Sequence, residues 1–590
     1  MAASRSAVPP PVPRIPIVAL SLLVLLALPL AADDLTVGWI SRSPEIDYVW
    51  GSTNPTVEGW PAAGQDITWR AHVRTWSDAP QTVRYRWTLD GAPTLGGAVT
   101  LAPNAVTTVD LPSKWSFERH RIGFSIDTAN VMAEESEVNN TLTVFSDALA
   151  VGFWVEQSFY DYFRENQHKL GTGSTSFEDW AQQTMTYFNE MAALAVYPET
   201  PEGVLDRLRL QKIVVVPDQA LPLSGFPDGT SLGATGGTHP DHLDHSVDLM
   251  WGFRTGTLSR YRDDFRPVPQ NDFYVGYAAL HEMGHARYLV DIYAWDVTHR
   301  QSSEFQIEIR ENGASIVGPY LPSTHRTPEQ GLMNAQYTFL DRYGAITWNH
   351  IAGARAVMGN YNEPRNFAKF LNDFPAQNRL TVRDGDGNLM RNADIWFYYS
   401  MANGAVWYST HYDNVPDLKL RTDENGQVLV GRAPFAADGQ VVHTVGLTNG
   451  VAIVRVATAE TVAYGYLESR LFNIAYWGGR TDFADHDLVV GRACNSEGPE
   501  LTGPAWDARP GGPALNLTWR SVPGATAYRV YAAANLGKPR LIGTTTDTSL
   551  AVNLSGSIHW WVEADLGVCG TRRSDMRRFF VEAPRRRAVR

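Results

Sequence analysis

The sequence predicts a multidomain protein in which one α+β domain is flanked by three antiparallel β-sandwiches. A chain of 590 residues is too long for a single hydrophobic core. Its content of 44% hydrophobic and 19% charged residues excludes a mainly disordered chain. Alternation of apolar and polar residues dominates both ends of the chain, whereas helical periodicity is found mainly in its middle.

Changes in these patterns divide the chain into five segments. The expected segments are a signal peptide at 1–32, a β-sandwich at 33–148, an α+β domain at 149–378, a β-sandwich at 379–493, and a β-sandwich with an Arg-rich tail at 494–590. The formal net charge of −13 argues against nucleic acid as the main partner.

The first segment has the features of a secretory signal peptide. Arg5 and Arg14 precede an apolar run, 15–32, which ends in small residues and is followed by Asp33. Cleavage after Ala32 would make the protein secreted or place it at the cell surface. An uncleaved anchor is the alternative, because the run has a marginal length for crossing a bilayer. We expect no other membrane contact.

The segment 33–148 shows the alternation of half-buried strands, for example at 67–73. Leu89, Asp90 and Gly91 predict a hairpin turn. The stretch from His120 to Asn140, with its acidic and Asn-rich end, resembles the CARDB family of bacterial immunoglobulin-like adhesion modules. That resemblance implies a spacer or binding module without chemistry of its own.

The segment 149–378 mixes helices and strands. A capping box at 175–178 predicts a helix over 176–195. Strands are expected at 212–216 and 247–251, and a second helix from Tyr274 to about Tyr293. The acidic stretch 303–311 has a possible helical pattern. This mixture predicts an α+β domain.

The two C-terminal segments return to strand patterns with turn-rich connections. Residues 379–493 loosely resemble transthyretin-like or carboxypeptidase-regulatory sandwiches. The strands around 515–519 and 522–531 resemble those of a fibronectin type III domain, which has a similar early Trp and a Tyr-rich strand. Cys494 and Cys569 flank this region. The sequence is compatible either with a disulfide between them or with two free thiols.

The chemistry is concentrated in the run His281-Glu282-Met283-Gly284-His285. Two His residues four apart lie on one helical face, so their imidazoles can bind a single Zn²⁺. Glu282, next to the first His, is placed to take a proton from an attacking water. The spacing therefore predicts a catalytic zinc site with Glu282 as general base.

A zinc site of this kind needs a third protein ligand. The run 281–293 resembles the metzincin pattern H-E-x-x-H-x-x-G-x-x-H/D, and most closely its snapalysin-type and immune-inhibitor-A-type bacterial versions. The resemblance implies Asp291 as the third ligand and Tyr293 as its neighbour. The family glycine is replaced by Tyr288. If the helix continued, Asp291 would lie about 280° around the axis from His281 and point away.

Glu304 is the alternative ligand, because its distance from His285 resembles the gluzincin pattern. Glu308 and Glu311 lie close to it. A segment at 331–334 resembles the metzincin Met-turn, with Met333 beneath the metal, and this favours Asp291. His239, His242 and His245 form another cluster, for which we expect a surface loop rather than a metal site.

Together these features predict a zincin-type α+β catalytic domain flanked by three immunoglobulin-like β-sandwiches. The expected activity is that of a secreted zinc-dependent metalloendopeptidase acting on a protein or peptide substrate. The sandwiches are expected to contact a surface or polymer. Two alternatives stay open: a surface adhesion protein with an inactive zincin domain, and a zinc hydrolase of a non-peptide substrate.

Overall fold

The computed structural model describes most of the chain in separate stretches. These are residues 34–46, 60–170, 174–221, 235–236, 246–254, 277–287, 289–298, 305–321, 324–325, 327, 330–334, 337, 339–353, 372–402, 410–435, 450–492, 494 and 496–581. Strands predominate in them and form several separate sheets. The protein is therefore multidomain and mainly β, as predicted. The predicted signal peptide at 1–32 and the end of the basic tail lie outside the described residues. Among the described helices, none has the length and apolar character needed to cross a membrane.

The N-terminal sandwich consists of two antiparallel sheets with strand orders β1-β2-β5 and β4-β3-β6-β7. Its strands are β1 Leu35–Ser43, β2 Asp66–Thr75, β3 Gln81–Leu89, β4 Ala92–Leu101, β5 Val106–Lys114, β6 Arg121–Ile126 and β7 Thr141–Phe145. Trp69, Trp87 and Phe124 are buried between the sheets. The predicted hairpin turn is confirmed, because Asp90 and Gly91 have φ of 50° and 83° and connect β3 to β4.

The central segment contains a mixed sheet with the order β10-β11-β8-β9. Strand β8 runs parallel to both neighbours, and β10 is antiparallel to β11. The elements are β8 Leu149–Glu156, α1 Gln157–Leu170, α2 Phe177–Leu194, β9 Leu208–Val216, β10 Thr235–Gly236, β11 Leu249–Phe253, α4 Tyr277–Ala286, β12 Val297–Thr298, β13 Phe305–Ile307, β14 Arg310–Glu311, β15 Ala314–Ser315, β16 Thr324–His325 and α5 Arg342–Asn349. Every residue of β8 is buried, as expected for a strand covered on both faces.

Helix α2 agrees with its predicted range but begins with a different cap. The hydroxyl of Ser176 accepts a hydrogen bond from the backbone N–H of Asp179 at 3.2 Å. The Asp179 carboxylate accepts from the backbone N–H of Thr175 at 2.9 Å. The helix therefore starts one residue later than the predicted capping box, because Asp179 and not Glu178 supplies the acidic partner.

Two helix predictions in the central segment are wrong. Helix α4 ends at Ala286 instead of continuing to Tyr293, because the backbone N–H of Leu289 bonds to the carbonyl of Gly284 at 3.0 Å. The buried Arg287 side chain then pairs with Asp206 at 2.7 Å. The stretch 303–311 is not helical where it is described: β13 instead pairs in parallel with β20, about a hundred residues later.

The sandwich in the segment 379–493 is called the third sandwich below, because it forms the third domain of the chain, and it has the sheet orders β22-β17-β25 and β21-β18-β23-β24. Its elements are β17 Gln377–Arg383, β18 Asp394–Tyr399, β19 Met401–Ala402, β20 Thr410–Tyr412, β21 Leu418–Arg421, β22 Gln427–Gly431, β23 Val451–Ala457, β24 Val462–Glu468, α6 Arg470–Trp477 and β25 Phe483–Val489. The first and last long strands, β17 and β25, pair in parallel, so the chain returns to its starting strand at the end of this sandwich.

The C-terminal sandwich pairs β26-β27-β30 in one sheet and β29-β28-β31-β32 in the other, with β33 also on β31. Its strands are β26 Leu501–Gly503, β27 Ala514–Trp519, β28 Ala527–Ala534, β29 Arg540–Thr545, β30 Ser549–Asn553, β31 Gly556–Asp565, β32 Thr571–Arg573 and β33 Arg577–Val581. Cys494 and Cys569 form a disulfide, with an S–S distance of 2.09 Å.

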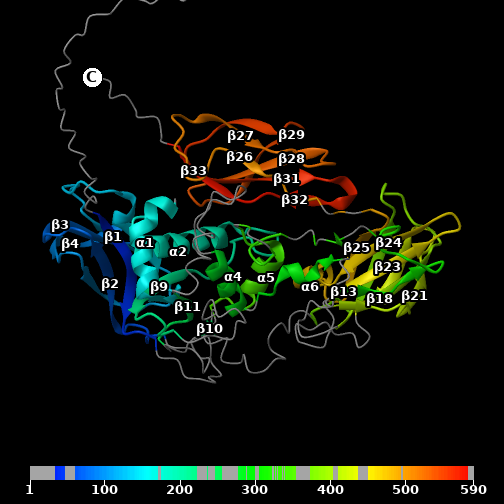
Figure 1. Ribbon diagram of the computed structural model, residues 1–590, viewed down its shortest axis with the longest axis horizontal. Helices are drawn as coiled ribbons and strands as arrows, with labels where there is room; N and C mark the ends of the chain where they lie inside the picture. Colours follow the sequence, from blue (N-terminus) through cyan, green and yellow to red (C-terminus); the bar gives the residue numbers. More distant parts are fainter. Residues whose placement is uncertain are drawn as a thin grey trace, which may run out of the picture.

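The three sandwiches pack against the central segment. Figure 1 shows the N-terminal sandwich at one end, the third sandwich at the other, and the C-terminal sandwich lying along the central helices. The buried core of the central segment includes Trp39, Tyr398 and Trp561, one from each sandwich. The central segment therefore shares its core with all three sandwiches.

Candidate metal centre

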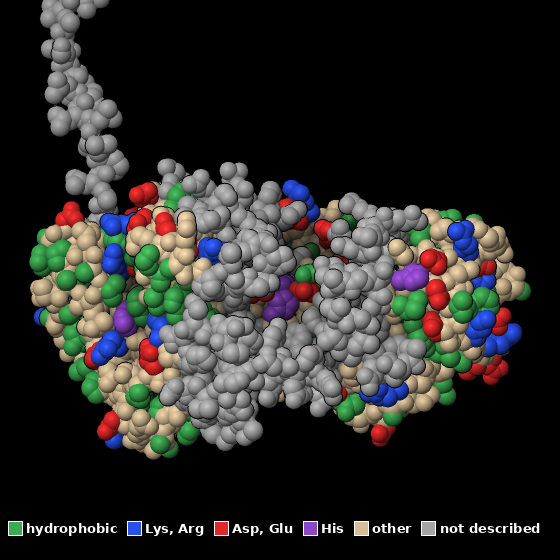
Figure 2. All heavy atoms as spheres, turned by 60° about the horizontal axis from the view of Figure 1, so that its bottom comes forward, with side chains coloured by type: hydrophobic (Ala, Val, Ile, Leu, Met, Phe, Trp, Pro, Cys, Tyr) green, Lys and Arg blue, Asp and Glu red, His purple; other side chains and the backbone are tan. Residues whose placement is uncertain are grey.

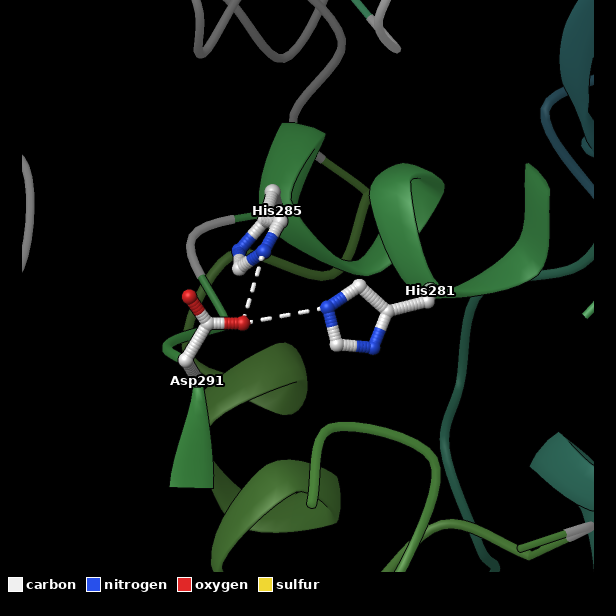
Figure 3. A group of neighbouring side chains, drawn as sticks. All are labelled: His281, His285 and Asp291. Carbon is white, nitrogen blue, oxygen red and sulfur yellow. Dashed lines mark hydrogen bonds and ion pairs between the residues drawn. The ribbon is translucent and has the colours of Figure 1, made fainter. Parts of the chain in front are cut away.

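Three predicted site residues meet at the end of helix α4. The imidazole rings of His281 and His285 lie 4.9 Å apart and nearly perpendicular. Oδ1 of Asp291 is 3.0 Å from Nε2 of His281 and 3.1 Å from Nε2 of His285 (Figure 3). Within the described part of the chain, this is the one group of at least three His, Cys, Asp or Glu whose ligand atoms all lie within 4.8 Å of one another.

Asp291 reaches the two His residues because the chain turns back after α4. The helix ends at Ala286, so the rotation of about 280° expected for a continuous helix does not occur. Asp291 has extended backbone and precedes a short 3₁₀ helix, η3 Ile292–Trp295. The N–H of Ile292 bonds to the carbonyl of Met333 at 3.0 Å. Tyr288, which replaces the family glycine, lies outside the described residues.

Backbone carbonyls fix the orientation of both imidazoles. Nδ1 of His281 donates to the carbonyl of Leu332 at 3.0 Å, and Nδ1 of His285 donates to that of Leu289 at 2.8 Å. Each Nδ1 must carry its hydrogen, since a carbonyl can only accept. Each Nε2 is therefore directed towards Asp291, the arrangement that outer partners impose on metal-binding His residues.

The electrostatics of the group match its geometry. Burial alone would lower the pKa of His285, but the hydrogen bond and charge of Asp291 raise it to about 9. Burial would raise the pKa of Asp291, yet the two imidazoles hold it far below its ordinary value. A divalent cation can replace the protons that hold the carboxylate and the two imidazoles together. Two imidazole nitrogens and one carboxylate oxygen fit Zn²⁺, with a fourth position left for water.

Glu282 lies beside this group without belonging to it. Its Oε2 is 4.0 Å from Nε2 of His285, and 19% of its side chain is exposed. Figure 2 shows histidine and acidic side chains exposed together near the middle of one face, between the N-terminal and third sandwiches. A partly exposed carboxylate at this distance can exchange protons with a molecule at the ligand group.

The predicted Met-turn lies directly under the helix. The N–H of Asn334 bonds to the carbonyl of Gly331 at 3.1 Å and closes the turn. Met333 is fully buried, and a Cβ added to Gly284 would lie only 2.6 Å from its sulfur. Tyr293 lies parallel to His281, with 6.5 Å between the ring centres.

The other candidates contribute nothing to this group in the described residues. Glu304 and the cluster His239, His242 and His245 lie outside them. Glu308 forms an ion pair with His411 at 3.2 Å, and Glu311 forms one with Arg455 at the third sandwich.

Sequence reasoning did not find the groups that support the site. These are the carbonyl of Leu332 and the carboxylate of Asp206. Asp206 accepts from Arg287, from the indole of Trp348 at 2.9 Å, and from the N–H of Gly353. Each contact joins segments that are far apart in the sequence, so no local pattern signals it.

Comparison with solved structures finds some matches to a part of the chain and others to most of it. No family model matches, and a search of curated proteins finds no matching relative. The CARDB domain of the PF1109 protein from Pyrococcus furiosus, in complex with di-metal ions, is 18% identical. The match covers 20% of this chain and 92% of that one, with a TM-score of 0.15. A domain of a cell surface protein from Methanosarcina acetivorans is 20% identical over 19% of this chain and 90% of that one, with a TM-score of 0.14.

A longer match is the exo-chitosanase CsxA of Amycolatopsis orientalis. It is 10% identical and covers 92% of this chain and 79% of that one, with a TM-score of 0.15. The functional argument rests on the geometry of the candidate metal centre.

Proposed function

We propose that the protein is a secreted zinc metalloendopeptidase with a zincin-type, metzincin-like catalytic domain. The observation that supports this most directly is the convergence of His281 Nε2, His285 Nε2 and Asp291 Oδ1, beside the carboxylate of Glu282. The extended run 281–293 and the turn carrying Met333 resemble the metzincin pattern in the same region. The apolar N-terminal segment supports a location outside the cytoplasm.

The chain's own residues have separate roles in this proposal. Bound zinc supplies a Lewis acid that polarises the scissile carbonyl and makes water acidic enough to attack at neutral pH. Glu282 takes the proton from the attacking water and delivers it to the leaving amine. Asp291, His281 and His285 hold the ion, and the carbonyls of Leu289 and Leu332 keep the imidazoles turned towards it.

The sandwiches would hold the catalytic segment on a protein, polymer or cell surface, a role inferred from the type of module. Their shared core with the central segment supports a fixed geometry between them.

The test is cleavage of an unfolded protein by zinc-loaded residues 33–590, with Glu282→Ala beside the wild type. We expect the variant to bind zinc but to lose about 10²- to 10⁴-fold in rate, the usual contribution of a general base. Glu308→Ala is the matched control, because this acid is exposed and pairs with His411. It should cut like the wild type.

Zinc binding by Asp291→Ala tests the ligand set separately. The variant should bind zinc much more weakly, whereas Glu304→Ala should bind as the wild type does. A wild type that binds zinc but cuts no protein would contradict the peptidase proposal. It would then favour a non-peptide substrate or a binding protein with an inactive centre.

A further inference from the structure

Arg573, on strand β32 of the C-terminal sandwich, lies against the central segment. Its guanidinium carbon is 4.2 Å from the ring centre of Phe339 and equally far from that of Trp561. Its Nη1 donates to the hydroxyl of Tyr197 at 3.1 Å, and that hydroxyl donates to the carbonyl of Leu340 at 2.8 Å. Arg573 thus contacts Phe339 directly and Leu340 through the hydroxyl of Tyr197.

Phe339 is connected to the candidate metal centre by two hydrogen bonds. The carbonyl of Phe339 accepts the N–H of Leu332 at 2.8 Å, and the carbonyl of Leu332 accepts Nδ1–H of His281. The next residue, Met333, accepts the N–H of Ile292, which follows Asp291. The turn 331–334 therefore contacts the segments of two ligands, and Arg573 holds the residue that anchors this turn.

We propose that Arg573 is a positioning residue of the metal centre. On this inference, which rests on the proposed function, the C-terminal sandwich is a structural part of the catalytic unit. A displacement of Phe339 would move the Leu332 carbonyl and turn the His281 imidazole away from its ligand position. Metal affinity is sensitive to such outer partners of a metal-binding His.

The chemistry of arginine suits this role. A planar guanidinium can stack between two aromatic rings while its N–H groups donate in the ring plane. A lysine ammonium keeps the charge and can reach one acceptor, but it cannot fill the same layer between Phe339 and Trp561. Arg573→Lys should therefore restore only part of what Arg573→Ala loses.

The experiment measures metal binding to the full chain rather than catalysis. Zn²⁺ affinity is obtained by competition with a chromophoric chelator, and the visible absorption of Co²⁺ at saturation reports the ligand geometry. We expect Arg573→Ala to weaken Zn²⁺ binding about 10-fold or more and to change the Co²⁺ spectrum. Arg573→Lys should fall between Arg573→Ala and the wild type.

Arg529→Ala is the matched control. Arg529 lies on β28 of the same sandwich and pairs with Glu563 and Asp565 within it. This variant should keep the wild-type affinity and spectrum. Near-UV circular dichroism checks that each variant is folded.

The outcomes separate this inference from the proposed function. Unchanged affinity and spectrum in folded Arg573→Ala would overturn the inference alone, as would an equal loss in Arg529→Ala. A wild type that takes up neither Zn²⁺ nor Co²⁺ would overturn the proposed function and the inference with it.

Discussion

Glu134 is a partly buried acid next to the first strand of the N-terminal sandwich. Its carboxylate accepts the N–H of Leu35 and the side-chain amide of Asn140, each at 3.0 Å. Burial, with smaller contributions from the nearby charges of Glu137 and Asp34, raises the pKa of Glu134 to about 7, although the two hydrogen bonds lower it. In the unfolded chain the same group titrates near its ordinary value of about 4.3.

The raised pKa predicts how stability changes with pH. A carboxyl group whose pKa is higher in the folded state favours folding fully below its unfolded pKa, and this contribution is lost as the pH rises through about 7. Glu134→Gln removes the charge, so it should raise the thermal midpoint at pH 8, with a difference that shrinks towards pH 5. Calorimetry of both proteins over this range measures the difference.

A glutamine at position 134 can still accept the N–H of Leu35, and the amide of Asn140 keeps its hydrogen bond to Glu137 at 3.2 Å. Glu118→Gln, at an exposed position of the same sandwich, is the control. A difference between Glu134→Gln and the wild type that stays constant from pH 5 to pH 8 would show that Glu134 does not titrate as inferred.

At the scale of the elements, helix α4 and the turn 331–334 pack without space between them. Alanine normally stabilises a helix interior relative to glycine by about 1 kcal/mol. Gly284→Ala should instead destabilise the protein by about 1 to 3 kcal/mol, because its Cβ would lie 2.6 Å from the sulfur of Met333. Chemical denaturation of the wild type and the variant measures the difference.

The double variant Gly284→Ala, Met333→Ala tests the cause. If the collision is responsible, the two substitutions should be strongly non-additive, since the smaller side chain at 333 makes room for the new methyl group. Simple addition of the two single effects would contradict this packing argument.

The elements that the sequence predicts well are those set by local patterns. Helix α2 follows from its apolar spacing and its polar cap, and the hairpin at 89–91 follows from Asp90 and Gly91. The end of α4 could not be predicted in this way. The Leu289–Gly284 hydrogen bond that ends it is accompanied by the pairing of Arg287 with Asp206, a residue about eighty positions earlier. Strand β13 likewise depends on β20.

The same distinction between local patterns and distant contacts applies to the candidate site. The spacing of His281, Glu282 and His285 is enough to place them on one face of a helix, and resemblance adds Asp291. The carbonyls that orient the imidazoles belong to leucines, whose side chains give no sign of this role. The carbonyl of Leu332 could be identified only once the turn 331–334 was seen beneath α4.

At the scale of the whole molecule, a buried ion pair joins helix α2 to the C-terminal sandwich. The carboxylate of Glu190 accepts from Arg578 at 2.8 Å and lies 3.0 Å from Nε2 of His559. Burial would raise the pKa of Glu190, but His559 and Arg578 hold it below its ordinary value. Arg578 also pairs with Asp507 within the sandwich.

Removing this carboxylate should loosen the C-terminal sandwich. Glu190→Gln leaves a largely buried guanidinium with one partner fewer, at a cost on the order of 3 kcal/mol. We expect the C-terminal sandwich to unfold at a lower temperature than the rest, as a separate calorimetric transition. Glu202→Gln is the control, because Glu202 joins the same two units through an exposed pair with Lys538. Equal effects of the two variants would contradict a special role for the buried pair.

The position of Arg573 late in the sequence determines when, during synthesis, the proposed metal centre can be completed. A polypeptide is synthesised and exported from its N-terminus, so His281, His285 and Asp291 emerge long before β32. A nascent chain that ends after α5 carries every proposed ligand but lacks the guanidinium that secures the Met333 turn. Tight zinc binding would then wait until the final sandwich has folded onto the central segment. If both proposals hold, the order of the sequence would delay zinc-dependent activity until the C-terminal sandwich has been synthesised and has folded.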